Sequence, residues 1–140
     1  ASYANKMFFG WLRYDVFCGS GNLGYNTAAS DVYGISSATV SSLGLVGNWK
    51  YYVFEMRSDV SYTNNKIYIN TVSQSLSQQQ GSESAGNRTF NSGNGRIAGW
   101  IANTNYSIPM NCASFKVYNR ALTPQEIQQN YIATKSRFGL

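Results

Sequence analysis

The chain has 140 residues, of which 43% are hydrophobic, 15% are aromatic and only 12% are charged, with a net charge of +5. No apolar run approaches the ~20 residues of a membrane-spanning helix, and the Lys and Arg residues are scattered rather than gathered into a patch. We therefore expect neither a membrane nor a nucleic acid as partner, and a single domain over residues 1–140.

An all-β domain is indicated by eleven Tyr, seven Phe and thirteen Gly beside only two Pro, because aromatic residues suit pleated sheets and glycines suit tight turns. Residues 7–14, MFFGWLRY, are apolar enough for a central strand. Two short strands are predicted over residues 23–27 and 31–35, around a small turn at residues 28–30.

The middle of the chain predicts an antiparallel pair of strands. Apolar side chains alternate over residues 49–56 and again over residues 66–70, which is the period of strands with one buried face. The pair Asn70-Thr71 follows, and the turn type stays open because threonine accepts positive φ poorly. Residues 73–87 are rich in Ser and Gln and predict a strand remnant followed by an exposed loop.

The end of the chain predicts a strand and then a helix. Residues 113–118 alternate apolar and polar side chains, as a half-buried strand does. Thr123 is placed as an N-cap, Pro124 as the first helical residue and Glu126 as the partner in a capping box. We expect a short helix that starts within about two residues of Pro124 and docks through Ile127.

The closing string VYNRALTPQEIQQNY resembles the last strand and short helix of laminin-G-like, concanavalin-A-like jelly-roll domains. Four further segments resemble landmarks of that family in the family's order: residues 21–36, 49–56, 64–70 and 94–100. The resemblance implies an antiparallel jelly-roll sandwich with one short C-terminal helix. The ending KSRFGL is also similar to such domains in bacteriophage structural proteins.

Domains of this family open with one or two strands ahead of the position that Met7 occupies here, and these opening strands are missing from the sequence. A sandwich without them leaves sheet edges or core side chains open, and native proteins cover such features. Either an upstream segment is absent from this sequence or a neighbouring subunit supplies the missing cover. We expect the chain to be assembled with other proteins or with copies of itself, through contacts that include residues 1–9 and nearby aromatic residues.

Catalysis is not expected. The chain has no histidine, the commonest general base and a frequent metal ligand. Glucanases of similar fold use paired carboxylates, and the nearest approach is Glu55 with Asp59, where Arg57 between them suggests a surface ion pair. A glucanase-like enzyme is thus the third-ranked hypothesis, and we expect no cofactor and no metal site, since calcium needs a cluster of acidic oxygens.

Cys18 and Cys112 are the two cysteines. A bridge between them would close a long loop and stabilise the fold by roughly 4 to 5 kcal/mol. Free cysteines that pack as small hydrophobic residues are equally ordinary, so the sequence leaves both states open.

The family resemblance also implies sugar binding by loops at the rim of the sandwich. Amides and a carboxylate satisfy sugar hydroxyls, and aromatic rings stack on pyranoses. The candidate residues are Asn26, Asp31, Trp100, Asn103, Asn105 and Tyr106. The alternative is that the polar residues cap turns and that the tryptophan fills the core.

Taken together, the motifs predict a non-enzymatic structural or adhesive module at the surface of a virion, either a capsid decoration protein or a tail or fibre domain. Its partners would be other virion proteins or copies of itself, with cell-surface carbohydrate as a further candidate. The alternative is a carbohydrate-binding lectin module of a secreted or cell-surface protein, which would be extracellular.

Overall fold

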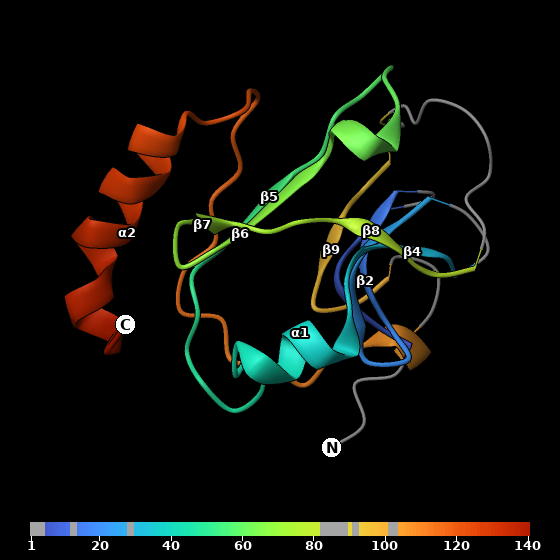
Figure 1. Cartoon of the computed structure of the whole chain (residues 1–140), viewed down its shortest axis with the longest axis horizontal. Coiled ribbons are helices and arrows are strands. Elements are labelled where there is room, and N and C mark those ends of the chain that lie inside the picture. Colours follow the sequence, from blue (N-terminus) through green and yellow to red (C-terminus); the bar gives the residue numbers. More distant parts are fainter. Residues whose placement is uncertain (1–4, 12–13, 28–29, 82–89, 91–92, 101–103) are drawn as a thin grey trace.

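The computed structural model of the protein describes residues 5–11, 14–27, 30–81, 90, 93–100 and 104–140 (Figure 1). Two antiparallel sheets form the body, and a helix at the C-terminal end lies beside them. The fold is therefore all-β with a C-terminal helix, as the sequence predicts. No helix among these residues is long and apolar enough to span a membrane.

The larger sheet has six strands in the order β8-β4-β3-β2-β1-β9. Their bounds are β1 Lys6–Gly10, β2 Asp15–Gly19, β3 Asn22–Asn26, β4 Val32–Ile35, β8 Ser77–Gln80 and β9 Arg96–Ile97. The smaller sheet has three strands in the order β5-β6-β7, namely β5 Tyr52–Glu55, β6 Lys66–Ile69 and β7 Val72–Ser73. The strands predicted over residues 23–27, 31–35 and 66–70 are confirmed within one residue at each end.

The core lies mainly between the two sheets. One face of the larger sheet and the inner face of β6 supply its fully buried side chains, which include Val16, Leu23, Tyr25, Ile67 and Ile69. A second cluster, Met7, Phe17 and Val32, lies on the opposite face of the larger sheet, under Trp100 and Tyr106. Alternation along β2 explains the division, because successive side chains of a strand point to opposite faces.

The turn after β6 is made by Asn70 and Thr71, which have φ values of 47° and 74°. Two positive values in a two-residue hairpin are the geometry of a type I′ turn. Threonine is strained there because its branched Cβ crowds the backbone in the left-handed region.

Helix α2, Pro124–Phe138, begins where the sequence predicts and is 15 residues long. Thr123 and Glu126 form the expected capping box, and Ile127 is the buried residue of the helix. Hydrogen bonds from Arg120 and from the backbone of Thr123 lower the pKa of Glu126 to about 2. Local capping chemistry therefore fixes this boundary.

Three expectations about the elements are wrong. Residues 7–14 do not form one strand: β1 ends at Gly10, and a second strand, β2, starts at Asp15. A six-residue helix, α1 Ser37–Ser42, is capped by the side chain of Ser36 and was not expected. Residues 113–118 are not a strand, because no other strand pairs with them in the described part of the chain.

Candidate binding groove

The two sheets are unequal in width, so the smaller sheet cannot cover the whole inner face of the larger one. The smaller sheet packs on β3, since the Tyr25 hydroxyl donates to the Glu55 and Lys66 carbonyl oxygens, with distances of 3.1 and 2.7 Å. Its strand β5 also packs on Phe8 of β1. Beyond β5 the described chain adds no further strand to the smaller sheet. Side chains of β1 and β9, among them Phe9 and Ile97, line the space beside the free edge of β5.

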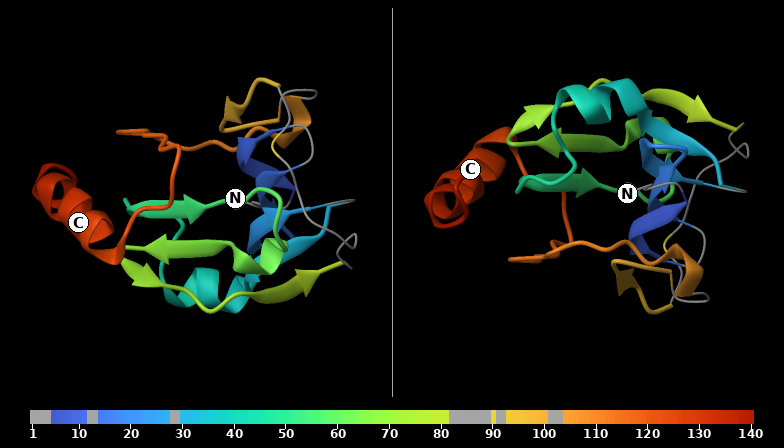
Figure 2. Two further views of the ribbon diagram at one scale, coloured as in Figure 1. Left: turned by 90° about the horizontal axis from the view of Figure 1, so that it is seen from above. Right: turned by 90° about the horizontal axis from the view of Figure 1, so that it is seen from below.

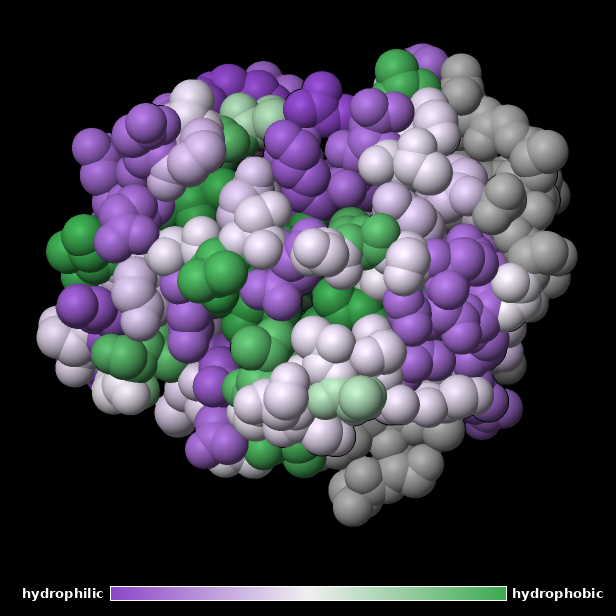
Figure 3. Space-filling view, viewed as in Figure 1, coloured by the Kyte–Doolittle hydropathy of each residue, from purple (hydrophilic) through white to green (hydrophobic). Residues whose placement is uncertain are grey.

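An open groove of about 1630 Å³ occupies this position. Strands β1 and β5, the loop before β5, residues 108–122 and α2 line it, mostly with apolar side chains. Figure 2 shows the segment after residue 108 running at a distance from the smaller sheet before it turns towards α2, and Figure 3 shows hydrophobic residues reaching the surface between α2 and the sheets. The volume exceeds the roughly 300 to 1,000 Å³ of ordinary small-molecule pockets, so the groove suits a polypeptide segment.

One wall of the groove is the unpaired edge of β5. Asn70 N donates to Tyr51 O at 2.9 Å, which sets the register in which Tyr51, Val53 and Glu55 bond to β6. Backbone groups of an antiparallel strand alternate in direction, so the N–H and C=O groups of Tyr52 and Phe54 point to the free edge. The side chains of these two residues pack on Phe8 of β1, with ring centroids 5.3 and 6.0 Å apart.

The opposite wall is the segment of residues 113–118. Its apolar side chains are exposed: Phe115 at 49%, Val117 at 78% and Tyr118 at 43%. The Phe115 ring stacks on Phe9 of β1, with centroids 6.4 Å apart, which holds the segment beside the larger sheet. The segment thus keeps the alternation of a strand, and none of the described strands pairs with it.

Basic side chains surround the groove. Arg57 and Arg120 form ion pairs with Glu55 and Glu126, respectively. Lys50 and Lys116 also line it, and neither makes an ion pair with another described residue. The rim of the groove therefore carries positive charge.

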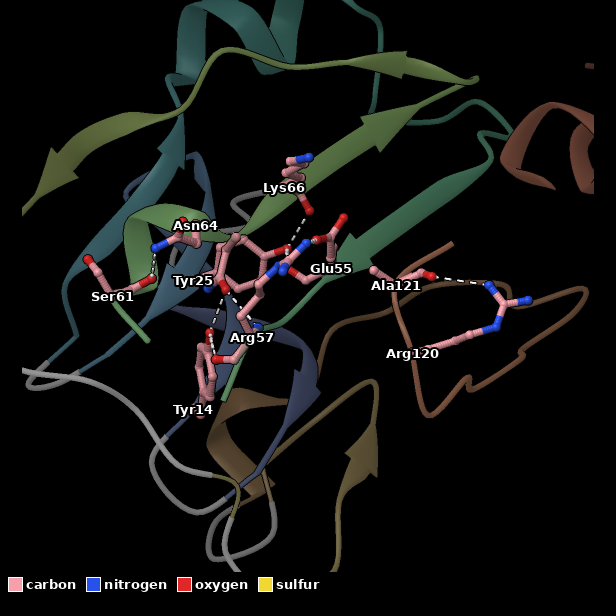
Figure 4. A network of polar contacts seen from close by, with 10 residues as sticks. Tyr14, Tyr25, Glu55, Arg57, Ser61, Asn64, Lys66, Arg120 and Ala121 are labelled. Carbon is pink, nitrogen blue, oxygen red and sulfur yellow. Dashed lines mark hydrogen bonds and ion pairs between the residues drawn. The ribbon is translucent and has the colours of Figure 1, made fainter. Parts of the chain in front are cut away.

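A polar network fixes the smaller sheet beside the groove (Figure 4). The Tyr14 hydroxyl donates to Asn65 Oδ1 at 2.6 Å, and the backbone N–H of Arg57 donates to the same oxygen at 2.9 Å. The Arg57 Nε donates to Glu55 Oε1 at 2.7 Å. The expected ion pair of Glu55 and Arg57 is thus formed, with the Glu55 side chain buried and the Arg57 side chain 45% exposed.

Asp15 is the buried acid of the larger sheet, with 3% of its surface exposed. Burial raises the pKa of its carboxyl group to about 7, although the backbone N–H of Trp11 donates to Oδ1 and opposes the rise. Its cross-strand neighbour Asn26 has a buried Oδ1 for which no hydrogen-bond partner occurs among the described residues. Nothing in the sequence around Asp15 marks it as buried, since a single Asp before a strand is ordinary at a turn.

The predicted rim residues lie at two places. Asp31 is 1% exposed, and its carboxylate accepts hydrogen bonds from Thr27 N and Thr27 Oγ1, both at 2.7 Å, inside the turn between β3 and β4. Asn26 ends β3 beside that turn. The aspartate thus performs the turn-capping role that was the alternative to sugar binding.

Trp100 and Tyr106 pack together over the second core cluster, with ring centroids 5.6 Å apart. The Trp100 Nε1 donates to the Trp11 carbonyl oxygen at 2.6 Å. Asn105 accepts a hydrogen bond from Lys6 Nζ through its backbone oxygen at 3.0 Å. Asn103 lies outside the described residues.

Cys18 and Cys112 are both free thiols, the first buried and the second exposed. Burial raises the pKa of the Cys18 thiol to about 12, so this residue acts as a small hydrophobic side chain. The bridged alternative is therefore not formed. Among the described residues no group of three or more His, Cys, Asp or Glu side chains is placed to hold a metal ion.

Searches against models of protein families, curated proteins and solved structures give no match for this chain. The groove and its two unpaired walls are thus the features on which a functional proposal rests. The sequence analysis expected contacts through residues 1–9 and nearby aromatic residues; Phe8 and Phe9 do line the groove, and residues 1–4 lie outside the described residues. The alternation over residues 113–118 was the signal that could have located it.

Proposed function

We propose that the chain is a non-enzymatic structural or adhesive module of a virion surface, built as a laminin-G-like jelly-roll sandwich that is completed by assembly. Two kinds of observation support the proposal. The motifs that resemble laminin-G-like domains are spread from residue 21 to residue 131, and the two antiparallel sheets are compatible with that architecture.

The observation that carries the proposal is the open apolar groove beside β5. Exposed apolar surface of this extent in a monomer marks a site of interaction with other molecules. Phe115 and Val117 on one wall and the β5 edge on the other are features that a second polypeptide covers, by burial at ~25 cal/mol per Å² and by backbone hydrogen bonds. Other virion proteins or copies of the chain are the partners we propose, at a capsid, tail or fibre.

The lectin alternative has less support. Its one carboxylate, Asp31, is buried and already accepts two hydrogen bonds from Thr27. Trp100 has its ring against Tyr106 and its Nε1 bonded to a backbone oxygen, so it serves the second core cluster.

Analytical ultracentrifugation of the 140-residue chain at micromolar concentration tests the proposal. We expect defined oligomers or larger assemblies, with interfaces that bury more than roughly 1,000 Å² in total. A cooperative, well-folded monomer that stays monomeric throughout this range would overturn it.

A further inference from the structure

The free edge of β5 has no strand partner in the part of the chain that the structure describes. The N–H and C=O groups of Tyr52 and Phe54 point to this edge, and no described strand pairs with them. An unpaired edge of this kind is a template for another strand. Both residues have apolar, well-packed side chains, so the edge is held in a fixed geometry.

The same chain carries an unpaired strand-like segment. Residues 113–118 alternate apolar and polar side chains, and Val117 is the most exposed of the large hydrophobic residues that the structure describes. The β5 edge and residues 113–118 line the same groove. We propose that they are complementary between two copies: residues 113–118 of one copy add to the β5 edge of a second copy, and the second copy reciprocates.

This arrangement has a simple symmetry. A two-fold axis between the copies gives four strands in a row: β5 of the first copy, residues 113–118 of the second, residues 113–118 of the first, and β5 of the second. Each groove thus holds one strand from the other copy, which bonds to both of its walls. The exchange joins the two smaller sheets into one continuous sheet across the dimer. It rests on the proposed function, because it names a second copy of the chain as the partner of the same groove.

Assembly of this kind buries Phe115 and Val117 in both copies, which are 49% and 78% exposed in the single chain. It also brings the Lys50 and Lys116 side chains of two copies towards each other. Like charges repel and salt screens them. Added salt should therefore strengthen the dimer, whereas salt would weaken the docking of an acidic partner protein.

The proposed strand exchange between two copies is tested by amide hydrogen exchange at Tyr52 and Phe54, followed residue by residue. The same samples are examined by sedimentation. The two amides point to the free edge of β5. We expect them to exchange more than about tenfold more slowly at high micromolar concentration than at a dilution where the chain sediments as a monomer. The amide of Val53, which bonds within the sheet, serves as the reference and should stay protected at both concentrations.

Each outcome is decisive. A dimer in which the Tyr52 and Phe54 amides stay unprotected overturns the strand exchange but leaves the proposed function standing. Protection of these amides in a monomer shows that residues 113–118 close onto β5 within one chain, which also overturns the exchange. A monomer with unprotected amides overturns both the exchange and the proposed function.

Two matched variants locate the contact. Val117→Asp places a charge on the segment of residues 113–118. We expect it to weaken dimerisation by at least about tenfold and to abolish the concentration-dependent protection of the Tyr52 and Phe54 amides. Val72→Asp changes another exposed valine, 62% exposed, on the far edge of the smaller sheet and away from the groove. It should dimerise like the unmodified chain. Equal behaviour of the two variants would contradict the proposed contact.

Discussion

The buried carboxyl group of Asp15 makes the stability of the fold depend on pH in an unusual direction. Its pKa is raised from 3.8 to about 7 by burial. Between these two values the folded chain holds a proton that the unfolded chain has released, so the free energy of unfolding falls as the pH rises. Each pH unit across this window corresponds to about 1.4 kcal/mol, which gives a loss on the order of 4 kcal/mol between pH 4 and pH 7.

Asp15→Asn removes this dependence, because asparagine is neutral and keeps an oxygen that accepts the Trp11 N–H. We expect the variant to match the unmodified chain near pH 4 and to exceed it by a few kcal/mol at pH 8. Urea unfolding followed by tryptophan fluorescence at several pH values measures both curves.

Asp59→Asn provides the control, since Asp59 is an exposed acid. Its pH profile should follow that of the unmodified chain. The reasoning about Asp15 is refuted if the unmodified chain is equally stable at pH 5 and pH 8, or if Asp15→Asn keeps the same slope as the unmodified chain.

Further predictions concern single sites. Tyr25→Phe leaves two carbonyl oxygens between the sheets without their donor and should lower the free energy of unfolding by about 1 to 3 kcal/mol in urea titrations. Thr71→Gly relieves a positive φ of 74° and should raise the melting temperature, unless the turn is not left-handed in solution. Thr123→Ala removes the cap of α2 and should cost about 1 kcal/mol, with loss of helical circular dichroism. Incubation with laminarin or agarose should release no reducing ends, and any activity that Glu55→Gln abolishes would contradict the non-enzymatic assignment.

How far the sequence could predict the fold depends on whether an element is specified locally. Helix α2 begins at Pro124 as expected, because Thr123 and Glu126 satisfy its first N–H groups whatever the rest of the chain does. Helix α1 was missed because six residues rich in Ser, Thr and Val have low helix propensity, and only the Ser36 cap announces it.

Strands depend on partners, and this is where the expectations were wrong. Residues 113–118 have the alternation of a strand, but a strand exists only when another edge bonds to it. Residues 7–14 look like one apolar strand, yet β1 ends at Gly10 and its partner β2 begins only at Asp15, so Trp11 and Tyr14 lie between the two strands. The sequence shows the alternation of a strand, but it does not show which strand pairs with it.

The candidate site, too, could be predicted from the sequence only in part. The uncovered surface was expected in general terms, but its position beside β5 depends on the unequal widths of two sheets. Asp31 was a candidate ligand because of its residue type and its expected place on a rim loop, whereas its burial in the turn follows from contacts with Thr27 that any Asp near a turn could make.

The most direct test of the account is an experimental structure of the chain in its assembled form. We expect an extended polypeptide strand at the free edge of β5, bonded to the Tyr52 and Phe54 backbone, with Phe115 and Val117 buried at the contact between polypeptides. A groove that holds only solvent, or one that residues 113–118 of the same chain have closed, would contradict the claim that assembly completes the sandwich.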